Sequence, residues 1–464
     1  MARWLYVLVA QALYWIAFLW RRALVRTTFV AVTGTHGKTT AKELLATVLG
    51  SWRPTFRSAH NENTGLPLTL NLLRVRPWHR FAVIEIGVGA PGEMRRLARL
   101  VRTDVALVLT VLRAHIKVFG DRDSHAAEKT VLLEELRPGG LAVLNADDPR
   151  VARMAASVRG RALLFGTSPG LDVWADAAVS RWPGRLELEI HTRDGESCHV
   201  RTRLVGTHWR AAATAVLAAA RALGLPLREA AAALATAGPF LSRMQPMLLP
   251  NGAIVLRDDY DGSFDTFEAA LRVLAEARAA RRVAVISDVS DYGSTMRRKR
   301  LAHLGREAAR AAEVVVFVGE AAAHGRRGAL AAGLAPENVY AFTGLRQATE
   351  FLRGSLRQGD LVLLKGRISD HVSRLFFTQL GPIRCWKTHC EKVIACDVCS
   401  ELGNRPADTQ RAMPAPPHAD VPSVATPPSV RRGGNGQSAD GQSVIPLPSA
   451  GQASDSEGSG WAGG

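Results

Sequence analysis

The chain has 464 residues, of which 59 are Lys or Arg and 42 are Asp or Glu, so its formal net charge is +17. This length predicts two to four domains with an ample core. The basic residues are spread along the chain without a base-stacking aromatic motif, so we expect no nucleic-acid partner; an anionic membrane surface and phosphorylated substrates both remain as explanations of the charge.

Residues 1–26 predict a membrane anchor or a helix lying in the membrane interface. The run from Trp4 to Trp20 is apolar apart from Gln11, with one arginine before it and three after it. Seventeen residues at about 1.5 Å each barely cross a bilayer, so a span and an interfacial helix both stay open. The greater positive charge after the run predicts that the protein lies at the cytoplasmic face of the cell membrane. A cleaved signal peptide is disfavoured because no small-residue cleavage site follows; a buried core helix is the remaining alternative.

Residues 30–40, VAVTGTHGKTT, have the pattern of a strand, a phosphate-binding loop and a helix. Glycines let backbone N–H groups approach phosphate oxygens, the Lys38 ammonium would lie over the β- and γ-phosphates, and the Thr39 hydroxyl can hold Mg²⁺. Two residues rather than four separate the glycines, so the match to the strict motif is imperfect, and a glycine-rich turn is the alternative. The predicted nucleotide-binding residues are Gly34, Thr35, His36, Gly37, Lys38, Thr39 and Thr40.

Short apolar runs alternate with helical stretches between Phe29 and Phe240, which predicts an α/β domain with a mainly parallel sheet. Alternating stretches around a turn at 193–196 predict an antiparallel hairpin within 171–205. A second α/β series begins near Ile254 and predicts a Rossmann-like domain. The predicted strands are 29–32, 81–85, 105–110, 141–144, 162–165, 283–287, 314–318, 339–342 and 361–364, and the first domain's predicted helices include 41–49, 93–101 and 125–136.

Five regions result from this division: an N-terminal membrane segment, a central ATP-binding domain, a C-terminal α/β domain, a cysteine cluster and a tail. Their predicted bounds are 1–26, 27–240, 241–380, 381–403 and 404–464. The tail is rich in Pro, Ser, Gly and Gln with almost no aliphatic clustering, so it is predicted to be disordered.

Three polar residues follow predicted strands at the sheet edge where α/β proteins place their sites. Glu85 ends an apolar run, His115 follows the next strand, and Lys129 lies on the helix after that. A carboxylate and an imidazole there suit a divalent cation beside a nucleotide. Taken singly, each residue also has a structural explanation: Glu85 as a helix cap, His115 as a loop histidine and Lys129 as a solvated lysine.

Together, these motifs resemble those of the Mur ligase family. TGTHGKTT resembles the family's nucleotide loop, including the short glycine spacing, and VIEIGVGAPGEM resembles its central motif. AHIKVFGDRDSHAAEKT and VLNADDPR are similar to the branch that adds D-alanyl-D-alanine to the peptidoglycan precursor. RDDYDGSFDTFEAAL, SDVSDYG and LVLLKGR continue the likeness, which covers roughly residues 29–378.

The resemblance implies an ATP- and Mg²⁺-dependent amide ligase that forms an acyl phosphate, which an amine then attacks. Lys38 would clamp the phosphates, Thr39 and Glu85 would hold one Mg²⁺, and His115 would hold a second. Lys129 matches the family's carbamylated lysine, a neighbour of the metal. The resemblance also assigns nucleotide contacts to Arg243, Asp259 and Tyr260, and substrate contacts to Asn61, Asn63 and Lys365.

The chain departs from the family pattern at recognition surfaces. The family's N-terminal UDP-binding domain has no counterpart ahead of the first predicted strand. Trp209 follows His208 where the family usually has Asn; it would stack on adenine or fill the core, and we favour the core. Asp261 and Ser263 stand where the family usually presents Asn.

The implied partners are a carboxylate acceptor, an amino acid or dipeptide donor, the cytoplasmic membrane and other envelope-biosynthesis proteins. A second enzymatic interpretation is a poly-γ-glutamate-type synthetase or the modification of another envelope polymer. A third is a non-catalytic ATP-binding membrane scaffold, although binding alone does not require the ligands of a second metal.

The cysteines of the C-terminal region are spaced C-x4-C-x5-C-x2-C, at Cys385, Cys390, Cys396 and Cys399. Thiolates at such intervals can surround Zn²⁺, which we predict here. An iron–sulfur cluster and unpaired thiols remain alternatives. Cys198, in the predicted hairpin, is expected to serve packing alone.

Overall fold

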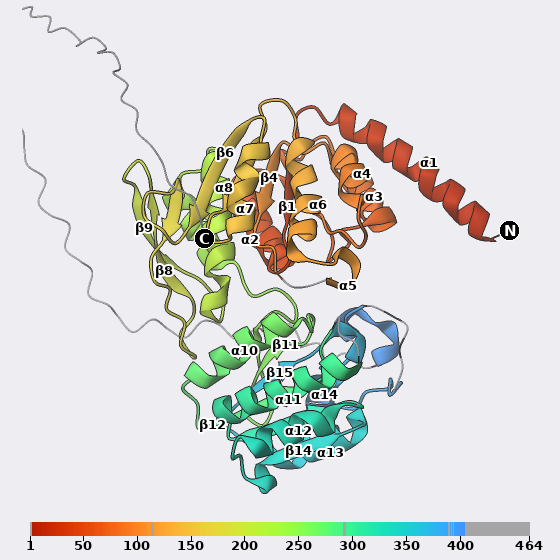
Figure 1. The fold of residues 1–464 in the computed structure, drawn as a ribbon, viewed down its shortest axis with the longest axis vertical. Helices are drawn as coiled ribbons and strands as arrows, with labels where there is room; N and C mark the ends of the chain where they lie inside the picture. The colour runs from red at the N-terminus through yellow and green to blue at the C-terminus, as the bar shows by residue number, and fades with distance from the viewer. Residues whose placement is uncertain are drawn as a thin grey trace, which may run out of the picture. The chain divides into compact units, whose positions relative to one another are not determined.

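The computed structural model describes residues 2–112, 116–290, 294–387, 390, 392 and 394–403 (Figure 1). His115 and the tail predicted to be disordered, 404–464, lie outside these residues.

The first sheet has nine strands in the order β2-β3-β1-β4-β5-β6-β7-β8-β9. Pairing is parallel from β2 to β7 and antiparallel between β7, β8 and β9. The predicted mainly parallel sheet with a hairpin region is therefore confirmed. The strands are β1 (Thr28–Thr33), β2 (Thr55–Arg57), β3 (Phe81–Glu85), β4 (Val105–Val108), β5 (Leu141–Asn145), β6 (Arg161–Gly166), β7 (Val173–Ala175), β8 (Glu187–Thr192) and β9 (Ser197–Arg201).

Helices cover both faces of this sheet, which is why its central strands are apolar on both sides. On one face Val30 and Val32 pack with α2 (Lys38–Gly50), α8 (Arg210–Ala222) and α9 (Leu227–Thr236). On the other, Phe29 and Ala31 pack with α1 (Ala2–Ala23), α3 (Gly65–Arg74), α4 (Glu93–Val101) and α6 (Arg122–Glu134). Short elements complete this region: α5 (Ile116–Phe119), α7 (Pro149–Arg153), η1 (Met154–Ser157) and η2 (Thr207–Trp209).

The second sheet has six strands in the order β10-β11-β15-β12-β13-β14, and only β10 runs antiparallel to its neighbour. This confirms the predicted second α/β series. The strands are β10 (Gln245–Leu248), β11 (Ile254–Asp258), β12 (Arg281–Ile286), β13 (Val314–Val318), β14 (Val339–Phe342) and β15 (Asp360–Lys365). The helices are α10 (Phe264–Glu276), α11 (Ser294–Ala311), α12 (Ala322–Ala331), α13 (Leu345–Ser355) and α14 (Ser373–Leu380), with η3 (Pro336–Asn338) and η4 (Ile368–Asp370).

Helix α1 packs against the first domain along one side. The buried Arg21 side chain donates to the carbonyls of Val101 and Arg102 at 2.6 Å each and to Asp104 at 3.1 Å. Burial lowers the pKa of Arg21 to about 10, against the opposing effect of Asp104. Among the described residues, none of the helices has the length and apolar content needed to cross a bilayer.

The segment after α14 is attached to the second sheet by a buried ion pair. It contains two single turns, η5 (Cys396–Val398) and η6 (Ser400–Leu402). Arg257 of β11 donates two hydrogen bonds to Asp397, at 2.6 and 2.9 Å. Ile383 and Leu402 extend the core of the second domain, so this segment is an integral part of that packing.

Several element boundaries differ from those predicted. Strand β4 ends at Val108 rather than at 110, because the Thr110 carbonyl accepts a hydrogen bond from the Thr35 amide instead of continuing the ladder. Helix α6 begins at Arg122 rather than at 125, because the Asp121 side chain caps it by accepting from the Ser124 amide at 2.7 Å.

Candidate active site

The phosphate loop joins β1 to α2. Gly37 has φ of 78°, a left-handed conformation that favours glycine, and α2 begins at the next residue. Gly34 has φ of 146°, and a Cβ atom there would lie 3.1 Å from the Leu109 Cβ, a tight contact, so glycine suits the close approach of the loop to the neighbouring strand end. The Lys38 ammonium donates to the Thr35 carbonyl at 3.0 Å. Backbone amides and one ammonium therefore gather at the N-terminus of α2, an arrangement suited to phosphate.

A buried carboxylate lies directly beside this loop. Glu85 ends β3, which pairs with β1 in the register that sets Val32 opposite Glu85. Its two oxygens accept hydrogen bonds from the Thr39 hydroxyl at 2.9 Å and from the Asn63 side-chain amide at 2.7 Å. Because hydroxyl and carboxylate oxygens are ligands that Mg²⁺ accepts, the pair of Thr39 and Glu85 fits the predicted metal.

Lys129 is buried on α6, with 2% of its surface exposed. Its pKa lies well below the usual value because burial removes water from the ammonium, and Lys38 acts in the same direction. Burial likewise lowers the pKa of Lys38, against the opposing charges of Glu85 and Asp261. His115, the predicted second metal ligand, lies outside the described residues.

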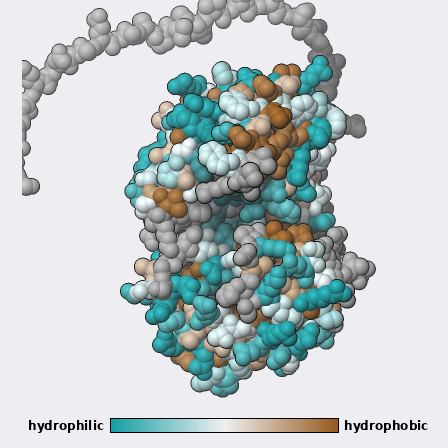
Figure 2. All heavy atoms as spheres, turned by 90° about the vertical axis from the view of Figure 1, so that its right-hand side faces the viewer, coloured by the Kyte–Doolittle hydropathy of each residue, from teal (hydrophilic) through white to brown (hydrophobic). Residues whose placement is uncertain are grey.

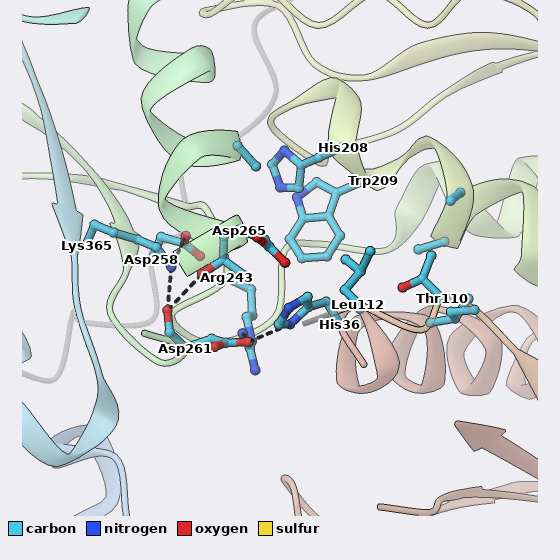
Figure 3. Close-up of a pocket in the computed structure, with 16 residues that line it drawn as sticks. His36, Thr110, Leu112, His208, Trp209, Arg243, Asp258, Asp261, Asp265 and Lys365 are labelled. Atoms are coloured by element: carbon cyan, nitrogen blue, oxygen red, sulfur yellow. Dashed lines mark hydrogen bonds and ion pairs between the residues drawn. The ribbon is translucent and has the colours of Figure 1, made fainter. Parts of the chain in front are cut away.

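Residues following β11 bring a second set of charges to the loop (Figure 3). The Asp261 carboxylate lies 3.4 Å from both His36 Nδ1 and an Arg243 guanidinium nitrogen. The Lys365 ammonium donates to the Asp261 carbonyl at 2.6 Å and pairs with Asp258 at 2.9 Å. Burial raises the pKa of Asp261, but His36, Arg243 and Lys365 together hold it well below its usual value. Asp261 is therefore a stable anion.

The two remaining predicted contacts from this strand differ in position. Tyr260 lines the polar cavity described below, and the Arg243 guanidinium lies 4.7 Å from the centre of its ring. Asp259 lines neither cavity: it is buried and pairs with Arg257 at 3.2 Å. Asp258 ends β11 and pairs with Lys365, whereas Asp259, the next residue, pairs back with Arg257 and does not reach the cavities.

Two adjoining cavities share the phosphate loop and Trp209. The first, of about 200 Å³, is largely apolar and is lined by residues that include Leu109, Leu112, His208 and Trp209. The second, of about 340 Å³, is polar, and the predicted residues that line it are Thr35, His36, Gly37, Lys38, Thr39, Thr40, Asn61, Asn63, Glu85, Arg243 and Tyr260. Lys365 lines the apolar cavity instead.

Trp209 combines both roles considered from the sequence. It is 8% exposed and packs in the core of the first domain, yet it lines both cavities. Its neighbour His208 is also enclosed, and burial lowers the pKa of His208 to about 4. A neutral imidazole and an indole thus form an apolar wall beside the charged loop.

Some lining residues were not selected from the sequence. Asp258 ends β11 just as Glu85 ends β3, so the rule that found Glu85 would also have found Asp258. Asp265 and Thr266 lie in the first turn of α10, whereas Ser290 and Arg367 follow β12 and β15. These four lie within the stretches that carry the resemblance to the family, RDDYDGSFDTFEAAL, SDVSDYG and LVLLKGR, but no role was assigned to any of them individually.

The four clustered cysteines lie around one small cavity of about 10 Å³. All are free thiols, Cys396 and Cys399 are buried, and the Cys396 Sγ lies 3.3 Å from His371 Nδ1. In the described conformation of residues 2–403, with its gaps, no three His, Cys, Asp or Glu side chains are placed to hold a metal ion. The predicted zinc site is thus not confirmed. Cys198 is buried in the first domain's core, as expected.

Comparison with known families decides what this arrangement belongs to. Residues 32–220 match the Mur ligase middle domain, and residues 242–368 match the domain described as Mur ligase, glutamate ligase domain. Together these matches cover more than half of the chain. The protein belongs to the Mur ligase family.

Two curated relatives of this Mur ligase carry the same enzyme name. The UDP-N-acetylmuramoyl-tripeptide--D-alanyl-D-alanine ligase of Mycobacterium leprae is 28% identical over 380 residues, which cover 76% of this chain and 74% of the relative. The Escherichia coli protein of the same name is 30% identical over 276 residues, covering 59% of this chain and 61% of its own.

Solved structures agree with this family assignment. A crystal structure of MurF from Acinetobacter baumannii superposes with a TM-score of 0.74 and 28% identity, covering 80% of each chain. MurF from Thermotoga maritima in complex with ADP shares the fold, with a TM-score of 0.69 at 22% identity over 80% of this Mur ligase and 83% of that chain.

Proposed function

We propose that this Mur ligase uses ATP to join an amine to an acceptor carboxylate through an acyl-phosphate intermediate. The observation that carries the proposal is the pairing of Thr39 with Glu85 at the N-terminus of α2, where a phosphate loop and a metal-binding carboxylate meet. The γ-phosphoryl group would move to the acceptor carboxylate, and the amine would then displace phosphate. The chain's own contribution is positioning and charge neutralisation.

Each of the two cavities would bind one part of the nucleotide. The polar cavity offers the α2 amides and Lys38 to the triphosphate. The apolar cavity, with Trp209 and Leu112 in its wall, suits a purine base, since an indole can stack on its face. Arg243 lines both cavities and would approach the phosphates from the second domain.

Mg²⁺ would be held by the Thr39 hydroxyl and the Glu85 carboxylate. Bound there, the ion would neutralise charge on the β- and γ-phosphates. Asn63 orients the Glu85 carboxylate through its 2.7 Å hydrogen bond. His115 remains the proposed ligand of a second Mg²⁺.

Lys129 is the proposed site of carbamylation. A lysine amine reacts with CO₂ only when it is neutral, and burial lowers the pKa of Lys129 well below its usual value. Addition of CO₂ with loss of a proton converts the amine into a carbamate anion. That anion would be attracted by the Lys38 ammonium and would support the second metal.

The proposed substrates are UDP-N-acetylmuramoyl-tripeptide and D-alanyl-D-alanine, the pair in the name of the relatives described above. This places the enzyme in peptidoglycan biosynthesis. No comparable support exists for a poly-γ-glutamate-type synthetase or for a non-catalytic scaffold. Asn61, Asn63 and Lys365 are the proposed contacts to the acceptor.

Phosphate release by the purified full-length chain tests this proposal. We expect release to require ATP, Mg²⁺, the UDP-linked tripeptide and D-alanyl-D-alanine together, and to be lost in Lys38→Met. Turnover with simple γ-glutamyl acceptors instead would select the polymer-synthetase alternative. Nucleotide binding without turnover over a broad acceptor panel would select the scaffold.

We also propose a structural zinc ion at the cysteine cluster. Four thiols around a cavity the size of one water molecule support it, although they would have to draw closer than in the described conformation. Metal analysis should find about one zinc per full-length chain and none in Cys396→Ser/Cys399→Ser, whereas Cys198→Ser should retain it. A wild-type chain without zinc would establish free thiols.

A further inference from the structure

The outward side of helix α1 carries large apolar side chains that are mostly exposed to solvent. Trp4 is 77% exposed and Leu19 is 66% exposed. The spacing of these residues follows the helical repeat, so they form one stripe along the helix. We call it the outer stripe; its members are Trp4, Leu8, Trp15, Ile16 and Leu19. Figure 2 shows an apolar patch in the upper part of the molecule, on the face turned toward the viewer.

The opposite side of α1 is held by the first domain, so it is not available to another partner. Ala17 is fully buried, and Tyr14 and Phe18 pack on the same core cluster. The Tyr14 hydroxyl donates to the Arg96 carbonyl at 3.3 Å, and the Trp20 indole donates to the Val75 carbonyl at 3.0 Å. A helix that is apolar all round but packed on one side has an apolar face left for something else.

The surroundings of the outer stripe are strongly basic. No Asp or Glu occurs before Glu43, and none occurs between residues 63 and 84, which include α3 and the following loop. The Arg96 guanidinium lies 4.8 Å from the centre of the Tyr14 ring, and Arg80 donates to the Arg26 carbonyl at 3.3 Å. Exposed arginines therefore lie beside α1, at Arg96, and beside the segment that follows it, at Arg80.

We propose that the outer stripe docks on the surface of a bilayer that contains anionic lipids. Helix α1 would lie in the plane of the interface, with its apolar side chains below the headgroups and the neighbouring arginines against lipid phosphates. Tryptophan suits this level because its ring is apolar while its N–H remains polar. Trp78, which is 66% exposed in the loop after α3, belongs to the same basic region.

Charge favours a lipid surface over a second copy of this chain. In a symmetric dimer the same face would meet itself, which would set the arginines around one α1 against those around the other. An anionic surface pairs with them instead. The proposal goes beyond the ligase reaction and concerns where that reaction takes place.

Vesicle co-sedimentation of the full-length chain tests the proposal without any turnover. The vesicles would be phosphatidylcholine alone or phosphatidylcholine with about one third phosphatidylglycerol. The variant is Trp15→Gln/Leu19→Gln, and the matched control is Val179→Gln/Leu248→Gln, which changes two other exposed apolar residues, 65% and 54% exposed. Unchanged thermal unfolding and unchanged ATP binding establish that the variants are folded.

We expect the wild type and the control to bind the anionic vesicles, less tightly in high salt, and the outer-stripe variant to bind at least about tenfold more weakly. Failure of the wild type to bind anionic vesicles would overturn the proposal. So would equal binding by the outer-stripe variant. A concentration-dependent dimer that the same two substitutions abolish would assign the stripe to a second copy.

Discussion

His36 Nδ1 lies 3.4 Å from a carboxylate oxygen of Asp261. His36 belongs to the phosphate loop of the first domain, and Asp261 follows β11 of the second. The contact therefore places an anion from one domain next to the loop that we propose for the triphosphate of ATP. His36, Arg243 and Lys365 together hold that anion in its charged form.

Asp261→Asn should bind ATP more tightly when Mg²⁺ is absent. The substitution removes a negative charge beside the loop and leaves His36 and Arg243 to the phosphates. We expect the affinity for ATP to rise about tenfold. Removing the repulsion between the phosphates and one partly buried charge changes the binding free energy by roughly 1–2 kcal/mol. Isothermal titration with EDTA present measures it, and Asp147→Asn, which lines neither cavity, is the control. Equal or weaker binding would show that Asp261 does not oppose the nucleotide.

Glu85→Gln should lose ligation while keeping its fold. Glutamine retains the hydrogen bond from Thr39 but lacks the charge that holds Mg²⁺. We expect activity to fall by at least about a hundredfold, with part of it regained at high Mg²⁺. Phosphate release titrated against Mg²⁺ is the measurement. Glu134→Gln, on the exposed surface of α6, should behave as wild type.

Lys129→Ala should lose ligation and partly recover it when short-chain carboxylic acids are added. The acid would occupy the space of the missing side chain and supply the anion that the carbamate provides. Rescue should depend on chain length, because the space left by a lysine stem is narrow. Full activity of the variant without added acid would contradict carbamylation of Lys129.

Lys129 should also make the protein less stable at lower pH. Its pKa is lowered in the folded chain, so between that lowered value and about 10.5 the unfolded chain binds the extra proton. The free energy of unfolding should therefore rise with pH in this window, by up to about 1.4 kcal/mol per pH unit for this one group. Thermal unfolding in CO₂-free buffers at several pH values, compared with Lys129→Met, measures the contribution. Identical slopes for the two chains would refute it.

Asp397→Ala should loosen the cysteine segment. Arg257 would lose two hydrogen bonds but keep Asp259, so we expect the chain to be destabilised by about 3 kcal/mol, the lower end for a broken buried pair. The buried thiols of Cys396 and Cys399 should then react faster with a thiol reagent. Glu401→Ala, which removes exposed ion pairs with Lys387 and Lys392, should have little effect. Equal thiol reactivity in both variants would show that Asp397 does not hold the segment.

Local patterns predicted the parts of the site that adjacent residues define. The phosphate loop, the strand ending in Glu85 and the helix carrying Lys129 all have such patterns. The contact of Lys365 with Asp261 depends on β11 and β15 being neighbours across 104 residues, which no local pattern expresses. Strand β10 was missed because it is four residues long and contains Pro246, which is tolerated at a sheet edge.

Helix α1 shows a different limit of sequence analysis. Its residues are apolar on every side, so their periodicity could not indicate which side packs on the domain. The arginine at position 21 appeared as part of a flanking basic cluster, whereas its side chain is buried against backbone carbonyls. Only the packed structure separates the covered side from the outer stripe.

The buried guanidinium of Arg21 has a practical consequence for anyone who shortens this protein. Cutting the chain after residue 26 would remove the hydrogen bonds that the Arg21 guanidinium donates to Val101, Arg102 and Asp104. It would also expose the ring of Phe29, because the guanidinium lies 3.7 Å from the centre of that ring. A truncated version made to ease purification would therefore lose contacts that stabilise the first domain, as well as helix α1.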